Sequence, residues 1–161
     1  EIYEEFIVEN EDRNNKILEI VTNIRENNKK ARVIILTKNL SHAGTLQNII
    51  SGAYKLEGED NLPKRYETIN NFLKEKASSV LIGTKVLQTG INIEEITHFI
   101  NARGLKAEIP TLQALGRALR KHHEKQNVYV YDFMDKVKYL KTHSNKRKSH
   151  YMSEGHEVHE L

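Results

Sequence analysis

Short apolar runs alternate along the chain with longer stretches in which apolar residues recur every three or four positions. Two of the runs, residues 33–37 and 80–84, are apolar almost throughout, which is typical of strands buried on both faces of a sheet. Three weaker runs lie at residues 53–56, 97–101 and 128–132. The pattern therefore predicts five strands, and we expect residues 2–8 to add an edge strand.

The stretches between these runs have the pattern of helices. Residues 15–28 carry Ile17, Ile20, Val21 and Ile24 at helical spacing. Ser41 is predicted to cap a second helix that Gly52 ends, and Pro63 and Pro110 suit the first turns of two more. This alternation predicts a RecA-like α/β fold with a doubly wound, mainly parallel sheet and helices on both faces.

Residues 1–135 are predicted to form this domain, and residues 136–161 a basic extension. The extension holds six bases and four histidines but few core-forming residues, and we expect a short helix over 144–153 within a largely solvated tail. His156 and His159 have the spacing of one helical face, but without cysteine or a nearby carboxylate cluster no metal site is expected.

Composition and charge limit the possible class, location and partner of the protein. A chain of 161 residues with 38% hydrophobic residues is long enough for one domain with a core. No apolar run is long enough to span a membrane, and the lack of cysteine favours a reducing, cytoplasmic location. Residues 1–30 hold eight acids and five bases, so the rest of the chain is net positive. That asymmetry weakly favours a polyanion as partner, and plain solubility is the alternative.

Two arginines stand out near the predicted helix that starts at Pro110. In the run Gln113-Ala-Leu-Gly-Arg-Ala-Leu-Arg120, Arg117 and Arg120 are three residues apart and share one helical face. Adjacent guanidinium groups suit the oxygens of a phosphoryl group. The alternative is a solvated pair on the surface.

Several segments resemble, in the same order, the motifs of the second RecA-like domain of superfamily 2 helicases. Residues 113–120 match the Q-x-x-G-R-x-x-R form of motif VI, which is specific at this spacing, and residues 80–93 resemble motif V. Residues 33–37 with Ser41 are similar to motif IV, and residues 54–58 with Arg65 and Phe72 to motif IVa. The likeness covers about residues 30–135 and is strongest to bacteriophage UvsW-type DNA helicases.

The resemblance implies roles in ATP hydrolysis. Arg117 and Arg120 correspond to arginine fingers on the γ-phosphate of ATP held by a partner domain, and Gln113 to a residue that contacts the nucleotide. Gly116, Gly90 and Asn92 would lie beside the nucleotide. Asn92 departs from the aspartate common at its position, which puts a charge-assisted bond to the ribose in doubt.

The resemblance also implies contacts with the nucleic-acid backbone after each strand. The residues expected to make them are Thr37, Lys38, Asn39, Gly58, Thr84, Lys85 and Arg103. Thr37, Gly58, Thr84 and Arg103 follow predicted strands, so they are expected to line one edge of the sheet. Alternatively, Thr84 bonds its own backbone, and Lys38 and Arg103 are solvated loop cations. Arg65 is assigned a structural role first.

The motifs that hold the phosphates of ATP are absent from the sequence. It contains no G-x-x-x-x-G-K-[ST], no strand ending in an Asp-Glu pair and no G-x-G-x-x-G. We therefore expect part of a longer ATP-dependent DNA helicase, whose N-terminal RecA-like domain binds most of the ATP and Mg²⁺. The chain alone is expected to be inactive. In the whole protein, the resemblance favours branched or junction DNA and a role in repair or recombination.

Two other functions fit the same residues. The first is a non-catalytic, nucleic-acid-binding RecA-like module, and the second is an α/β domain whose arginine pair has no ligand.

Overall fold

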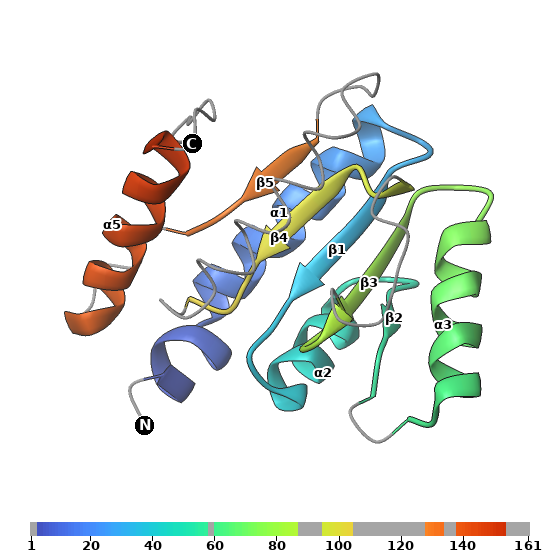
Figure 1. Ribbon diagram of the computed structural model, residues 1–161, viewed down its shortest axis with the longest axis horizontal. Coiled ribbons are helices and arrows are strands. Elements are labelled where there is room, and N and C mark those ends of the chain that lie inside the picture. Colours follow the sequence, from blue (N-terminus) through green and yellow to red (C-terminus); the bar gives the residue numbers. More distant parts are fainter. Residues whose placement is uncertain (1–2, 58–59, 87–94, 105–127, 134–137, 154–161) are drawn as a thin grey trace.

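The structure is a computed structural model that describes residues 3–57, 60–86, 95–104, 128–133 and 138–153 (Figure 1). Its elements in chain order are η1 (Glu4–Val8), α1 (Glu11–Asn27), β1 (Arg32–Leu36), α2 (Leu40–Ile49), β2 (Tyr54–Lys55), α3 (Leu62–Lys74), β3 (Ser79–Gly83), β4 (His98–Asn101), β5 (Tyr129–Tyr131) and α5 (Lys138–Ser153). The predicted helix after Pro110 lies outside the described residues.

The five strands form one sheet in the order β2-β3-β1-β4-β5, and every neighbouring pair is parallel. In the register of the three central strands, Val33 lies between Val80 and His98. The predicted parallel sheet, with strands near all five expected positions, is confirmed.

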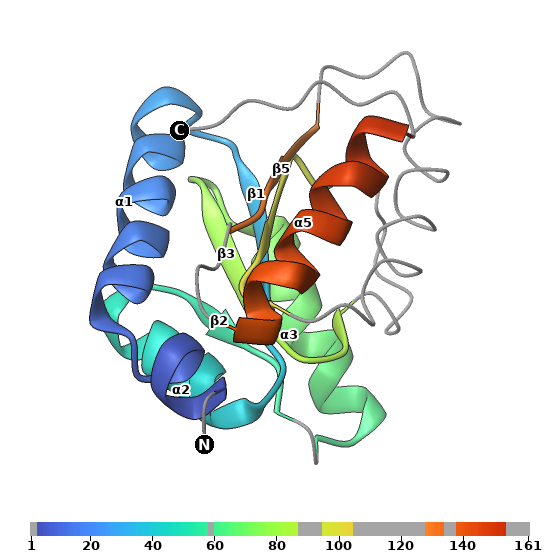
Figure 2. The same ribbon diagram turned by 90° about the vertical axis from the view of Figure 1, so that its left-hand side faces the viewer.

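Helices cover both faces of the sheet, as Figure 2 shows with the sheet seen nearly edge-on. On one face, Ile17 and Val21 of α1 and Leu46 of α2 pack in a cluster with Val33 and Ile35. On the other face, Ile69 and Phe72 of α3 pack in a cluster with Ile34, Leu36, Leu81 and Phe99. Successive side chains of residues 33–36 thus enter opposite cores, which is why all four are apolar.

The segment before α1 differs from its prediction. Residues 4–8 form the π-helical η1 and not an edge strand, and Ile7 and Val8 are buried with Tyr3. The reason is visible in the spacing, because Tyr3, Phe6 and Ile7 lie three and four residues apart and so share one side of a helical turn.

Besides the start of α1, which lies at Glu11 and not at residue 15, two helix boundaries also differ. Asn39 caps α2 in place of Ser41, because its side-chain oxygen accepts a hydrogen bond from His42 N at 3.0 Å and another from Ser41 Oγ. Gly52 lies just beyond the helix end with φ of 72°. The other boundary is that of α5, which begins at Lys138 and is longer than the helix expected at 144–153.

Candidate nucleic-acid interface at the carboxyl edge of the sheet

All five strands end at the same side of the sheet because they are parallel. We call the segments that follow β1, β3, β4 and β5 (residues 37–39, 84–85, 102–103 and 132–133) the carboxyl edge. Thr37 N donates to Gly83 O at 3.1 Å, and Ala102 N donates to Leu36 O at 2.9 Å, so backbone hydrogen bonds join the ends of β1, β3 and β4, where three of these segments begin. The edge brings together six predicted contact residues: Thr37, Lys38, Asn39, Thr84, Lys85 and Arg103.

The remaining predicted site residues lie outside the described part of the chain. They are Gly58, Gly90, Asn92, Gln113, Gly116, Arg117 and Arg120.

Thr37 and Asn39 are built into the turn between β1 and α2. Thr37 is fully buried, and its hydroxyl donates to Asn39 O at 3.1 Å, whereas the Asn39 side chain caps the helix. Between them, Lys38 is exposed. The local roles explain why these residue types follow the strand. Direct contacts of Thr37 and Asn39 with nucleic acid stay a prediction.

Tyr3 joins the ends of β1 and β4. Its ring lies under the Lys38 ammonium, with Nζ 4.3 Å from the ring centroid, and its hydroxyl donates to the backbone oxygen of Arg103. A cation–π contact at an exposed site stabilises by only about 0.5–1 kcal/mol, so Lys38 is oriented without being immobilised. Sequence reasoning missed this residue because it placed Tyr3 in an edge strand.

The turn after β3 is held by close packing. A Cβ atom on Gly83 would lie 2.8 Å from Val86 Cγ2 and 3.3 Å from Leu56 Cβ, so only glycine fits. This packing places Thr84 half-buried and Lys85 exposed at the edge.

A group of buried polar side chains lies beneath the edge. Arg13 of α1 is 7% exposed, donates to Ala102 O at 2.9 Å and has its guanidinium carbon 4.7 Å from the centre of the Phe133 ring. Asn14 donates to Val8 O at 2.8 Å, and its oxygen lies 2.9 Å from His42 Nε2. Arg13 thereby ties the start of α1 to the ends of β4 and β5.

The charge state of His42 follows from this position. Burial, with a further contribution from the Arg13 cation, lowers the pKa of His42 from 6.5 to about 4. The ring is therefore neutral at neutral pH, and the Asn14 oxygen selects the tautomer that carries its proton on Nε2. The sequence offered only polar residues at core-facing positions of α1 as an indication of this group.

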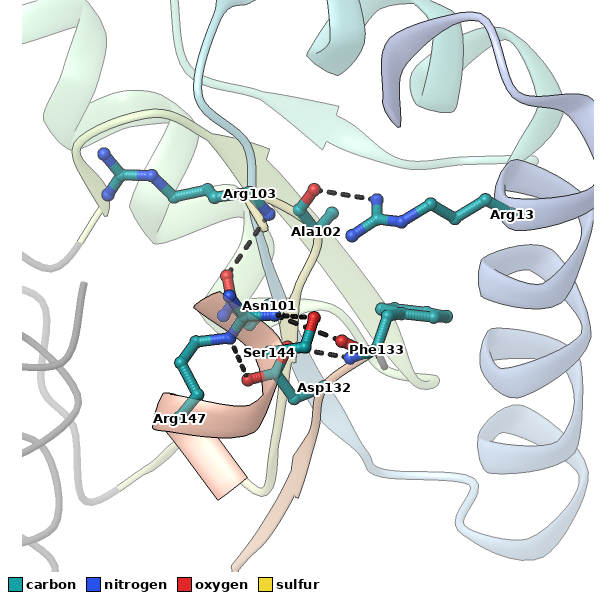
Figure 3. A network of polar contacts seen from close by, with 8 residues as sticks. All are labelled: Arg13, Asn101, Ala102, Arg103, Asp132, Phe133, Ser144 and Arg147. Atoms are coloured by element: carbon teal, nitrogen blue, oxygen red, sulfur yellow. Dashed lines mark hydrogen bonds and ion pairs between the residues drawn. The ribbon is translucent and has the colours of Figure 1, made fainter. Parts of the chain in front are cut away.

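Helix α5 is fixed to the end of β5 through Arg147 (Figure 3). Arg147 is 1% exposed, and its Nε donates to Asp132 Oδ2 at 2.8 Å. Its terminal NH2 group donates to Phe133 O at 3.1 Å and to Ser144 Oγ at 3.2 Å. The helix within the basic extension is therefore held against the domain by Arg147.

Neither a metal site nor a membrane-spanning helix is present among the described residues. These contain no group of three or more His, Cys, Asp and Glu side chains able to hold a metal ion. None of the helices in this part of the chain is long and apolar enough to cross a membrane.

Comparison with known proteins identifies the family of the chain. The family model of the helicase conserved C-terminal domain matches residues 12–122. The ATP-dependent DNA helicase uvsW of Enterobacteria phage T4 is 27% identical over 144 residues, which cover 86% of this chain and 28% of the relative. The putative ATP-dependent RNA helicase MJ1505 of Methanocaldococcus jannaschii is 32% identical over 126 residues, which cover 71% of this chain and 16% of the relative.

Solved structures show the same fold. The crystal structure of T4 UvsW has a TM-score of 0.70 and 22% identity, with 89% of this chain and 33% of that chain covered. Domain 2 of the DEAD-box helicase Mss116p, bound to an RNA duplex, has a TM-score of 0.55 and 16% identity. The match covers 75% of this chain and 49% of that chain. The chain thus spans less than a third of either curated relative, and it belongs to the family of helicase conserved C-terminal domains.

Proposed function

We propose that this domain is the second motor domain of an ATP-dependent DNA helicase or translocase. The observation that carries the proposal is the family match over residues 12–122, which includes the arginine pair, together with exposed Lys38 and Lys85 at the carboxyl edge. DNA is favoured over RNA because uvsW, which matches 86% of this chain, is named a DNA helicase.

In the proposed mechanism, a preceding RecA-like domain holds ATP and Mg²⁺. Arg117 and Arg120 reach that nucleotide and neutralise the charge that develops on the transferred phosphoryl group, an effect worth about 10³–10⁵ in rate in GTPases. Gln113, Gly116, Gly90 and Asn92 line the same nucleotide from this side. ATP binding then closes the two domains, and hydrolysis reopens them.

The carboxyl edge provides the grip on nucleic acid. Lys38, Lys85 and Arg103 offer cationic groups, and backbone N–H groups and Thr84 offer uncharged donors, which suit phosphate oxygens without reading base sequence. Alternating grip between the two domains converts closure into stepping along a strand. We place this activity in repair, recombination or remodelling of branched DNA.

The arginine pair provides the test. In the full-length protein, Arg117→Ala and Arg120→Ala are each expected to reduce DNA-stimulated ATP hydrolysis by at least 10³-fold while ATP binding is largely spared. Lys30→Ala is the control, because Lys30 is exposed at the opposite, amino edge of the sheet. Near-normal turnover in both arginine variants would rule out the finger assignment.

A second candidate is a binding module without motor activity. Asn92 in place of the usual aspartate favours it, because the charge-assisted bond to the ribose is lost. In that case the full-length protein binds DNA normally but shows no DNA-stimulated ATPase even before the arginines are changed.

A further inference from the structure

The positive charge of the chain is concentrated in one helix. The whole chain has 25 Lys and Arg against 22 Asp and Glu, for a net charge of +3. Helix α5 holds five of these bases (Lys138, Lys141, Lys146, Arg147 and Lys148) and none of the acids. The other 145 residues therefore carry 20 bases and 22 acids, a net charge of −2. Without α5, the chain would be slightly acidic.

From this distribution we infer that α5 is a second contact for the nucleic-acid backbone, additional to the carboxyl edge. The inference rests on the proposed nucleic-acid-binding function and extends it to a surface that the helicase motifs do not include.

The docking of α5 gives it a defined orientation. Arg147 and Ser144 are both 1% exposed and point into the domain, where Asp132 binds the arginine. Thr142, Asn145, Lys146 and Ser149 are exposed, and Lys148 is half-buried. One base thus anchors the helix, whereas exposed Lys146 and half-buried Lys148 are both accessible to solvent.

The same contacts fix α5 relative to the carboxyl edge. Arg147 bonds to Phe133 O, the Phe133 ring packs on Arg13, and Arg13 donates to the oxygen of Ala102, the neighbour of Arg103 (Figure 3). In Figures 1 and 2, α5 lies beyond β5, on the side toward which that strand runs. A polyanion bound along the edge would therefore meet a cationic helix held in place beside it.

The chemistry of the exposed face favours phosphates over a protein partner. Its described exposed side chains are hydroxyl, amide and ammonium groups, which donate hydrogen bonds to phosphate oxygens. A protein-docking face would be expected to present apolar or aromatic anchors at its centre. Like charges in one helix also repel one another, and a bound phosphate chain relieves that repulsion.

The test is the salt dependence of DNA binding by the full-length protein. Affinity for a fluorescein-labelled mixed-sequence duplex is measured at several salt concentrations for wild type and for Lys146→Ala/Lys148→Ala. The slope of log K against log salt should become shallower by about 1.8, since each lost phosphate contact on B-DNA removes about 0.9. Lys146→Arg/Lys148→Arg should keep the wild-type slope, which separates charge loss from damage to the helix.

Lys29→Ala/Lys30→Ala is the matched control, because it removes two exposed lysines at the opposite edge of the sheet. A slope that stays at the wild-type value in the α5 alanine pair, or that falls equally in the control pair, overturns the inference. Lys38→Ala is measured in parallel. If only Lys38→Ala makes the slope shallower, the inference for α5 fails and the proposed grip of the carboxyl edge stands. If neither Lys38→Ala nor the α5 alanine pair changes the slope, both contacts are ruled out.

Discussion

His42 lies fully buried between α1 and α2, at a position that disfavours a positive charge. Its pKa in the folded chain is about 4, against 6.5 when unperturbed. Between these values the unfolded chain binds a proton at His42 that the folded chain does not, so the free energy of unfolding falls as the pH falls. From pH 7 to pH 5 the loss should be about 2 kcal/mol.

Urea unfolding at the two pH values measures this loss. In His42→Gln, which cannot titrate but can still donate to Asn14, the loss should shrink by that amount. Burial lowers the pKa of His98 in the same direction, so part of the pH dependence should remain. Equal losses in wild type and His42→Gln would show that His42 is not the group responsible.

Two glycines give opposite predictions for the same substitution. Gly83→Ala should destabilise the fold by about 1–3 kcal/mol, because its Cβ would overlap Val86 in a packed core. Gly44→Ala should stabilise by about 0.5–1 kcal/mol, because Gly44 is in helix α2 and the new methyl group meets only Lys55 Nζ at 4.0 Å. Thermal unfolding of both variants checks the pair, and shifts of the same sign would contradict the packing described here.

Among the elements, those with an apolar run or a clear cap were predictable. Strands β1 and β3 are buried on both faces, so after their first residues, Arg32 and Ser79, they hold no polar side chain, and Pro63 marks the first turn of α3. Segment η1 was wrongly predicted as a strand, because the mixed polarity of residues 2–8 fits both the two-residue repeat of a strand and the 3.6-residue repeat of a helix. Tertiary packing decides between the two. The buried contacts of Arg13 and Arg147 could not be predicted, because polar contacts between residues distant in the sequence have no local pattern.

The anchor of α5 is testable at the same scale. Arg147→Met leaves Asp132 without this buried ion pair, and breaking such a pair commonly costs about 3–5 kcal/mol. Backbone amides of α5 should then exchange with deuterium at least tenfold faster, while those of β1 and β3 keep their protection. Arg25→Met in α1 is the matched control. Unchanged exchange in α5 would show that Arg147 does not hold the helix.

For the whole molecule, the sheet order and parallel strands explain why the polar loops converge at one edge. That convergence was predictable from the parallel arrangement of the strands, because the predicted contact residues Thr37, Thr84 and Arg103 each follow a strand. The charge distribution adds α5 beside the edge, on the far side of β5 from β4 (Figure 1). The proposed motor combines these surfaces with a nucleotide held by another domain of the same protein.

The most direct test of that proposal is whether nucleotide closes the two domains. The chain contains no cysteine, so Lys30→Cys introduces one unique label in this domain, away from the carboxyl edge. Fluorescence energy transfer to a second label on the preceding domain of the full-length protein should rise on addition of a non-hydrolysable ATP analogue and DNA. The rise should be lost in Arg117→Ala/Arg120→Ala. Transfer that is unchanged by nucleotide in wild type, or a full rise without both arginines, would contradict the two-domain mechanism.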